Sequence, residues 1–284
     1  MTPDSLAYAT EELRRADRDR YFATLVLPAR AREAMTALYA FNADIASVRE
    51  RAREPAAGEI RLQWWADALT GEEHGAVRAN PLADALLATI AEYGLPTPPL
   101  TRLIAARRFD LYHDPMPDIA TFEGYAGETV SALYQLGAMI LNGGSPIEGG
   151  DAAGHLGVAH ALIGHLRAFG YNASQGRIFL PRDVFAICGV TEGEVLAGQA
   201  SEGLAIALTR LSDMAHEHLE TADNAIRKLP RELRAVFAPA AVLRGQLRRI
   251  EVETPFQSQP DLADWQKIAA LAWWRLRTNC RKLT

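Results

Sequence analysis

The stretch of this chain that says most about its fold reads Leu38-Tyr39-Ala40-Phe41-Asn42-Ala43-Asp44-Ile45-Ala46-Ser47-Val48-Arg49-Glu50. Apolar residues recur in and before it at every third or fourth position, at Ala34, Leu38, Phe41, Ile45 and Val48. This is the spacing of one face of an α-helix. The pattern predicts a helix over about 28–53 with one buried stripe, and Pro28 suits its start.

Helical patterns continue along nearly the whole chain. We expect further helices over 4–19, 57–71, 80–93, 97–114, 119–142, 150–169, 201–228, 230–249 and 260–279, and two short ones within 182–200. No alternating strand pattern, hairpin signal, repeat or linker interrupts them. The chain is therefore expected to form a single all-α domain over residues 1–284.

Composition narrows the function classes. The net charge is −5 with no basic tail, which argues against a nucleic-acid partner. Only Cys188 and Cys280 are present, and the N-terminus lacks a secretory signal, so we expect a reducing, cytoplasmic setting. No run of 18 apolar residues predicts a membrane-spanning helix. The tryptophans Trp64, Trp65, Trp273 and Trp274 are expected to anchor helix packing, and they leave open a peripheral association with the inner membrane.

Several short motifs together resemble one protein family. They are Leu27-Pro28, Leu38-Tyr39-Ala40-Phe41, Trp64-Trp65, Phe109-Asp110-Leu111, Gly157-Val158-Ala159 and Gly176-Arg177-Ile178-Phe179-Leu180-Pro181. Over about residues 17–275 the chain resembles the squalene/phytoene synthases. The resemblance implies the isoprenoid-synthase fold, which is a helical bundle around a large apolar cavity.

Within that family the chain is most similar to a divergent branch, that of the mitochondrial complex I assembly factor. The similarity lies in Ala40–Val48, Arg61-Leu62-Gln63-Trp64-Trp65, Leu166-Arg167-Ala168 and Phe179–Val184. It implies respiratory complex I subunits, or an isoprenoid lipid, as partners.

The family's chemistry depends on Mg²⁺, which helps an allylic diphosphate to leave and prefers carboxylate and phosphate oxygens. Family members carry paired aspartates four residues apart, on one helix face. At the four matching positions this chain has Ala46, Glu50, Ala168 and Asn172, and the family's arginine in the first motif is Ala43. We therefore expect no catalytic residue, no metal and no cofactor, with Mg²⁺ relevant only if the chain is an enzyme.

Other polar residues do not replace these ligands. Asp44 lies two positions before Ala46, about 200° around the helix, so it should face away. Asp110 and Asp114 share the Asp-x-x-x-Asp spacing, but a polar role at a helix end fits them better than a metal site. The surroundings of His216 and His218 read as a solvated helix face.

The remaining candidates line the expected cavity. Tyr39, Phe41 and Tyr125 are spaced as core residues or as cavity contacts, and Arg167 and Arg177 resemble the diphosphate-side arginines of the family. Without metals, an unpaired buried guanidinium would be costly, so we expect these arginines to be neutralised inside the protein. At least one of them should pair directly with Glu50 or with a carboxylate of a neighbouring helix, such as Asp110. We also expect Glu50 and Asn172 to face each other across the cavity.

Two classes of function follow. The first is a non-catalytic accessory factor, implied by the resemblance to the complex I assembly factor. The alternatives are an active head-to-head prenyltransferase of the squalene/phytoene synthase type and an isoprenoid- or lipid-binding protein.

Overall fold

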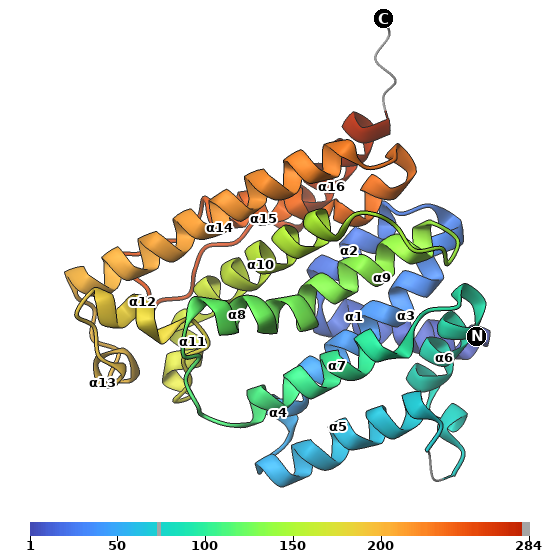
Figure 1. Ribbon diagram of the computed structural model, residues 1–284, viewed down its shortest axis with the longest axis horizontal. Helices are drawn as coiled ribbons and strands as arrows, with labels where there is room; N and C mark the ends of the chain where they lie inside the picture. Colours follow the sequence, from blue (N-terminus) through green and yellow to red (C-terminus); the bar gives the residue numbers. More distant parts are fainter. Residues whose placement is uncertain (73–74, 280–284) are drawn as a thin grey trace, which may run out of the picture.

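The computed structural model describes residues 1–72 and 75–279, and in that part of the chain every regular element is helical (Figure 1). The predicted all-α bundle is therefore confirmed. One large cluster of buried apolar side chains runs from Ala9 to Leu243 and joins nearly all the elements. Cys280 lies outside the described residues.

The N-terminal elements include the central helix of the bundle, α3. Their bounds are α1 (Pro3–Ala16), α2 (Arg18–Leu25), α3 (Ala29–Ala46), α4 (Val48–Arg51) and α5 (Pro55–Thr70). α3 packs against α1, α6 and α9 and buries most of its residues, including Met35, Leu38 and Phe41. This central helix ends at Ala46, the first of the candidate positions, and Glu50 follows on α4.

The middle of the chain supplies the helices that face α3. They are η1 (Val77–Ala79), α6 (Pro81–Tyr93), α7 (Thr97–Arg107), η2 (Arg108–Leu111), α8 (Ile119–Ala126), η3 (Gly127–Ser131) and α9 (Ala132–Leu141). The elements α8, η3 and α9 form one continuous helix, in which η3 is a π-helical turn. Single π-helical turns inside α-helices are frequent at functional sites.

The C-terminal part completes the bundle. Its elements are α10 (Gly150–Arg167), α11 (Phe169–Ser174), α12 (Arg182–Ile187), α13 (Glu192–Leu196), α14 (Glu202–Lys228), η4 (Arg231–Phe237), α15 (Pro239–Leu247) and α16 (Asp264–Asn279). Figure 1 shows α14 along one edge of the bundle and α5 along the opposite edge. α10 packs along α14, and the second pair of candidate positions follows its C-terminal end, with Ala168 between α10 and α11 and Asn172 on α11.

Some predicted boundaries are wrong. The helix expected over 28–53 is interrupted at Ser47, and the one over 97–114 stops at Arg107. The helix over 230–249 begins as a 3₁₀ segment, and the last helix starts at Asp264 rather than at about 260. Among the described residues, no helix combines the length and apolar character needed to cross a membrane.

Candidate functional site

The first pair of candidate positions spans a break between two helices. α3 ends at Ala46, and α4 begins at Val48. The Ser47 hydroxyl donates to the Asp44 carbonyl oxygen at 2.9 Å, and Arg51 Nη2 donates to the same oxygen at 2.6 Å. Such side-chain bonds to the backbone compete with the regular helical ladder. The two positions therefore do not share one face of a continuous helix.

The break changes which side chain points inward. The Glu50 side chain is 51% exposed, whereas that of Arg49 is only 16% exposed. The expectation that Glu50 faces the interior is therefore wrong. Each residue turns a helix by roughly 100°, so a small change of phase at Ser47 exchanges neighbouring side chains.

The second pair of candidate positions lies where α10 gives way to α11. Ala168 is the residue between the two helices, and Asn172 lies on α11 and is 4% exposed. The Asn172 carbonyl accepts the Arg177 backbone N–H at 3.0 Å, across a turn in which Gly176 has a φ of 71°. Asn172 thus points inward as expected. Because Glu50 is exposed, the two side chains do not face each other across the interior, which was the expectation.

An aromatic cluster fills the interior beside these positions. His165 stacks on Phe179 with ring centroids 5.0 Å apart, and Phe109 meets Phe179 at 6.3 Å. The Arg49 guanidinium lies over the Phe179 ring, 4.8 Å from its centroid. Arginine over an aromatic face is a favourable cation–π arrangement. A permanent positive charge thus lies next to the degenerate ligand positions.

A second buried arginine completes this interior. Arg107 Nη1 donates to Asp110 Oδ2 at 3.1 Å and to Tyr125 Oη at 2.8 Å, and Tyr125 Oη donates to Asp110 Oδ1 at 2.7 Å. The side chains of Arg107 and Asp110 are 13% and 3% exposed. Burial raises the pKa of Tyr125, so the phenol stays a neutral donor. Both Asp110 oxygens are therefore engaged, and Asp114 lies apart on the exposed loop.

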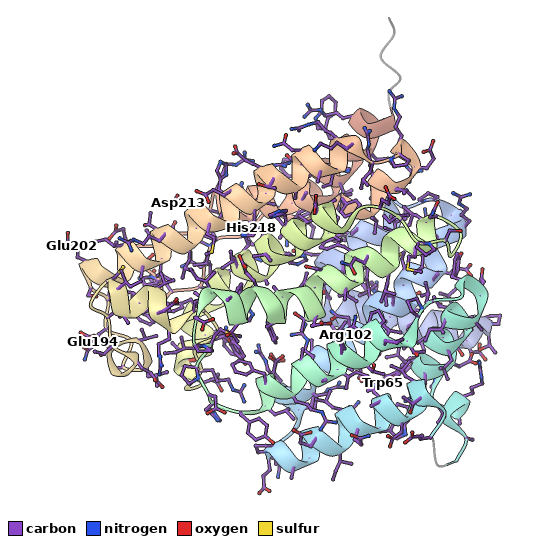
Figure 2. All side chains as sticks on the ribbon, viewed as in Figure 1. Trp65, Arg102, Glu194, Glu202, Asp213 and His218 are labelled. Carbon is purple, nitrogen blue, oxygen red and sulfur yellow. The ribbon has the colours of Figure 1, made fainter. Side chains whose placement is uncertain are left out.

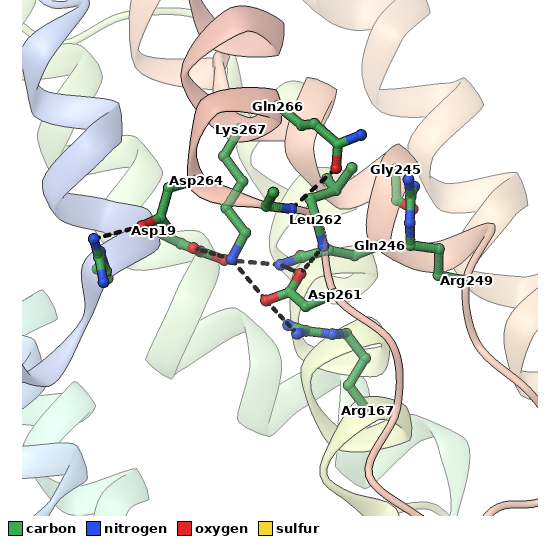
Figure 3. A network of polar contacts seen from close by, with 12 residues as sticks. Asp19, Arg167, Gly245, Gln246, Arg249, Asp261, Leu262, Asp264, Gln266 and Lys267 are labelled. Atoms are coloured by element: carbon green, nitrogen blue, oxygen red, sulfur yellow. Dashed lines mark hydrogen bonds and ion pairs between the residues drawn. The ribbon is translucent and has the colours of Figure 1, made fainter.

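The fates of Arg167 and Arg177 differ from the expectation. Arg167 Nη2 pairs with Asp261 at 2.8 Å, in a network with Lys267, Asp19 and Gln246 (Figure 3). It is thus neutralised, but not by Glu50 or Asp110. Arg177 makes no ion pair in the described part of the chain, and its buried Nε has no hydrogen-bond partner there. The expected direct Arg–carboxylate pair therefore forms at Arg167, whereas the neutralisation expected for Arg177 is not found in the described part of the chain.

Tyr39 and Phe41 are core residues. They are 2% and 0% exposed, and Phe41 meets Trp65 edge-on with centroids 4.9 Å apart. The Arg20 guanidinium lies over the Tyr39 ring at 5.8 Å. Burial is the main cause that raises the pKa of Tyr39 to about 12. Of the two interpretations of these residues, packing is the one that the geometry favours.

Asp44 faces away from the interior cluster, as its spacing predicts. Its carboxylate accepts hydrogen bonds from Trp65 Nε1 at 2.9 Å, Arg51 at 2.7 Å and Arg61 at 3.2 Å. These groups line a surface cavity of about 530 Å³ between α3, α4 and α5. Trp65 can be followed on α5 in Figure 2. Asp44 thus fastens α5 to α3 and is already saturated with donors.

His216 and His218, both expected on a solvated helix face, differ in their surroundings. His216 is exposed beside Glu220, but His218 is only 16% exposed on its side chain. His218 Nδ1 lies 3.0 Å from His155 Nδ1, and its Nε2 lies 3.5 Å from Glu123. The solvated-face interpretation is therefore wrong for His218, which links α14 to α10.

Divalent metal binding requires several oxygen or nitrogen ligands that converge on one point. Among residues 1–72 and 75–279, no group of three or more His, Cys, Asp or Glu side chains is placed to hold a metal ion. At the family positions, Ala46 and Ala168 have no ligand atom and Glu50 points outward. The residues present do not fit a Mg²⁺–diphosphate site.

Sequence reasoning missed three members of this interior, namely Arg49, Arg107 and His165. Arg107 stands three residues before Asp110, which is a helical ion-pair spacing that could have indicated it. Arg49 is next to a ligand position, but its inward direction depends on the break at Ser47. His165 lies one turn before Ala168 and has no local signal.

Two buried histidines predict a pH dependence. Burial, and then the charges of Arg49 and Arg107, lower the pKa of His165 to about 3, and burial and Arg20 do the same for His160. Below pH 6.5 these histidines are protonated in the unfolded chain but stay neutral in the native protein. The free energy of unfolding therefore falls as the pH falls. Lowering the pH from 7 to 5 should reduce the free energy of unfolding by about 2 kcal/mol for each of the two histidines.

Urea unfolding at both pH values checks this. His165→Phe keeps an aromatic ring in the cluster and should remove about half of the loss that the two histidines cause. The matched control is His216→Gln, on the exposed face of α14, which should leave the loss unchanged. An unchanged pH dependence in His165→Phe would contradict the interpretation of His165 as a buried neutral ring.

Comparison with known proteins places this geometry in context. The squalene/phytoene synthase family model matches residues 13–268. Complex I assembly factor 6 of Rattus norvegicus is 29% identical over 249 residues, covering 88% of this chain and 74% of the relative. The presqualene diphosphate synthase of Rhodopseudomonas palustris is 29% identical over 220 residues, covering 77% of each chain.

Solved structures agree on the fold. A dehydrosqualene synthase superposes with a TM-score of 0.82 at 20% identity, over 96% of each chain. A squalene synthase from Alicyclobacillus acidocaldarius gives 0.68 at 21% identity, over 98% of this chain and 97% of the other. At such identities the likeness concerns the helical architecture alone.

Proposed function

Because this chain belongs to the squalene/phytoene synthase family, we propose that it is a member that has lost Mg²⁺-dependent prenyl transfer. It acts instead as a non-catalytic accessory factor. The chain keeps the fold of the family, but a fold supports a reaction only where the reacting groups are in place.

One observation carries the proposal, namely the donor set at the family's four ligand positions. Two are alanines, one is the buried amide Asn172, and the remaining carboxylate, Glu50, points outward. Each lost ligand removes on the order of a few kcal/mol of transition-state stabilisation. The inward side chain beside them is the cation Arg49, which lies over Phe179 with its Nη2 3.8 Å from Glu50 Oε1, and a cation opposes a metal ion instead of binding one.

The process that the factor serves is proposed from its relatives. Proteins named complex I assembly factor 6 match 86–88% of this chain in four mammals. We infer that this chain supports the assembly of respiratory complex I, through contacts with one or more of its subunits. The degenerate site is consistent with that role, because an assembly factor needs the scaffold and its surface but no turnover.

A second candidate is an active prenyltransferase. It is favoured by the presqualene diphosphate synthase relative, which has the same 29% identity as the assembly factor of Rattus norvegicus, over 77% instead of 88% of this chain. Arg177, whose buried Nε has no partner in the described residues, is the feature of the site that an anionic substrate would satisfy. The residues at the four ligand positions argue against this candidate, because they supply only one carboxylate, and we therefore rank it second.

A deletion experiment distinguishes the two. Deleting the gene from its own organism should lower the amount of assembled complex I and leave isoprenoid products unchanged. Re-expression of the wild-type chain, or of a Glu50→Ala variant, should restore assembly, because Glu50 has no catalytic role. Loss of an isoprenoid product while complex I stays intact would overturn the accessory role.

A further inference from the structure

The last helix, α16, has two faces of different character. Its inner face packs on the bundle through Leu271, which is 1% exposed, and Trp274, whose Nε1 donates to the Arg234 carbonyl at 3.3 Å. Lys267 on the same side bonds Asp19 and Asp261, at 2.7 Å each (Figure 3). These contacts fix the direction in which the other face points.

The outer face of α16 is apolar and uncovered. Trp265 is 70% exposed, Ile268 43%, Trp273 61% and Leu276 59%, and Ala269 and Ala272 between them are also exposed. Spacings of three and four residues place all six on one side of the helix. We call these six residues the α16 stripe. An exposed apolar patch with two tryptophans marks an interaction surface.

Charge distribution indicates what covers the α16 stripe. Residues 227–284 contain 12 Lys and Arg against 5 Asp and Glu, a net charge of +7, whereas residues 1–226 carry −12. These cations are spread over the last 58 residues instead of forming a basic tail, and they give this part of an acidic protein a net positive charge. Asymmetry of this kind is typical of proteins that meet nucleic acids or anionic membranes.

The basic residues reach the surface near α16. Arg248, directly after α15, and Arg277, in the last turn of α16, are both exposed. Burial, and then the charges of Arg248 and Arg277, lower the pKa of Arg244, so these cations lie close enough to repel one another. The acidic residue of α16, Asp264, is paired with Arg18. The edge of the α16 stripe therefore offers positive charge.

We propose that the α16 stripe docks on the surface of a bilayer that contains anionic lipids. An amphipathic helix with tryptophans on its apolar side and cations beside it lies in the membrane interface, with the rings at the headgroup level. A second copy of the chain fits less well, because a twofold interface would bring two segments of charge +7 together. The inference goes beyond the accessory role and does not depend on it.

Flotation of the intact protein with vesicles tests the docking. It should bind vesicles of phosphatidylcholine mixed with phosphatidylglycerol, and more weakly those of phosphatidylcholine alone, with binding reduced by salt. Trp265→Ala and Trp273→Ala should each lower the partition coefficient by about tenfold, from lost apolar burial. Arg277→Gln should lower it by about fivefold, the usual effect of one cation near an anionic surface.

Matched controls lie on other faces. Ile268→Ala should weaken binding, whereas Ile187→Ala, at a 71% exposed position on α12, should not. Arg210→Gln on the exposed face of α14 is the control for Arg277. Because all these side chains are exposed, folding should be unaffected.

Three outcomes would overturn the proposal. The first is no binding to anionic vesicles by folded wild-type protein. The second is equal binding by the tryptophan variants and by Ile187→Ala. The third is a concentration-dependent dimer in sedimentation that Trp265→Ala abolishes, which would assign the α16 stripe to a second copy.

Discussion

Gly157→Ala is expected to destabilise the protein by about 3 kcal/mol, because overpacking of a tight interior contact costs about this much. A Cβ at Gly157 would lie 2.6 Å from the backbone nitrogen of Ser131 and closer still to its hydroxyl oxygen. Ser131 ends the π-helical turn η3, which presses this residue against α10. The backbone nitrogen belongs to a helix and cannot move without disturbing α8 and α9.

The same helix provides the control. Gly154→Ala, one turn earlier on α10, would place its Cβ in open space, so it should be neutral or stabilise by up to about 1 kcal/mol through better helix propensity. Adding Ser131→Gly to Gly157→Ala should rescue only part of the loss, because the backbone contact remains. Urea unfolding midpoints measure all four proteins. Similar midpoints for Gly154→Ala and Gly157→Ala would contradict the close approach of η3 to α10.

Asp110→Asn is the second change with a large expected effect, a loss of about 3–5 kcal/mol of unfolding free energy. The substitution keeps the shape of the side chain but leaves the Arg107 guanidinium buried with no opposite charge in contact. Tyr125→Phe, which removes one hydrogen bond to the same carboxylate, should cost only about 1–2 kcal/mol.

A double-mutant cycle tests the origin of that loss. The double variant Arg107→Met with Asp110→Asn removes both charges. Its loss of unfolding free energy should be smaller than the sum of the two single losses, because a buried ion pair can be replaced by uncharged groups at little cost. Equilibrium unfolding in urea gives the four free energies. Additive losses would show that Arg107 and Asp110 act independently of each other.

The fold could largely be read from the sequence, because the helices of this chain have strong apolar periodicity. The stripe from Ala34 to Val48 identified α3, and a capping box of Thr191 and Glu194 starts α13, one of the two short helices expected within 182–200. The helices expected from residues 80 and 97 begin within one residue of the observed starts of α6 and α7. Local patterns of this kind are enough to recognise a helical bundle.

The interior of the site was less predictable, because it depends on small changes of helix phase. Ser47 interrupts the helix between two ligand positions, and this turns Arg49 inward and Glu50 outward. Asp261, the partner of Arg167, lies 94 positions away along the chain, on the segment before α16, and reaches it through the packing of α15 on α10 and on α16. No local pattern reports such a distant pairing.

For the α16 stripe, the sequence shows the helical spacing but not which side of the helix is exposed. Its spacing can be read from the sequence, yet Trp273 and Trp274 could not be told apart there as core or surface. The structure separates them, since Trp274 packs on the bundle and Trp273 is exposed. Neighbouring residues on a helix point about 100° apart, so adjacent tryptophans at the edge of a buried face often divide in this way.

The central claim is that the chain no longer ionises a prenyl diphosphate. It is tested most directly by incubating the purified intact chain with farnesyl diphosphate and increasing Mg²⁺, and by measuring released diphosphate. We expect no release above the protein-free rate. A triple variant, Ala46→Asp with Ala168→Asp and Asn172→Asp, should also stay inactive, because Ala43 lacks the family's arginine, Glu50 points outward and Arg49 points inward. Release that rises in step with Mg²⁺ in the wild-type chain would contradict the account.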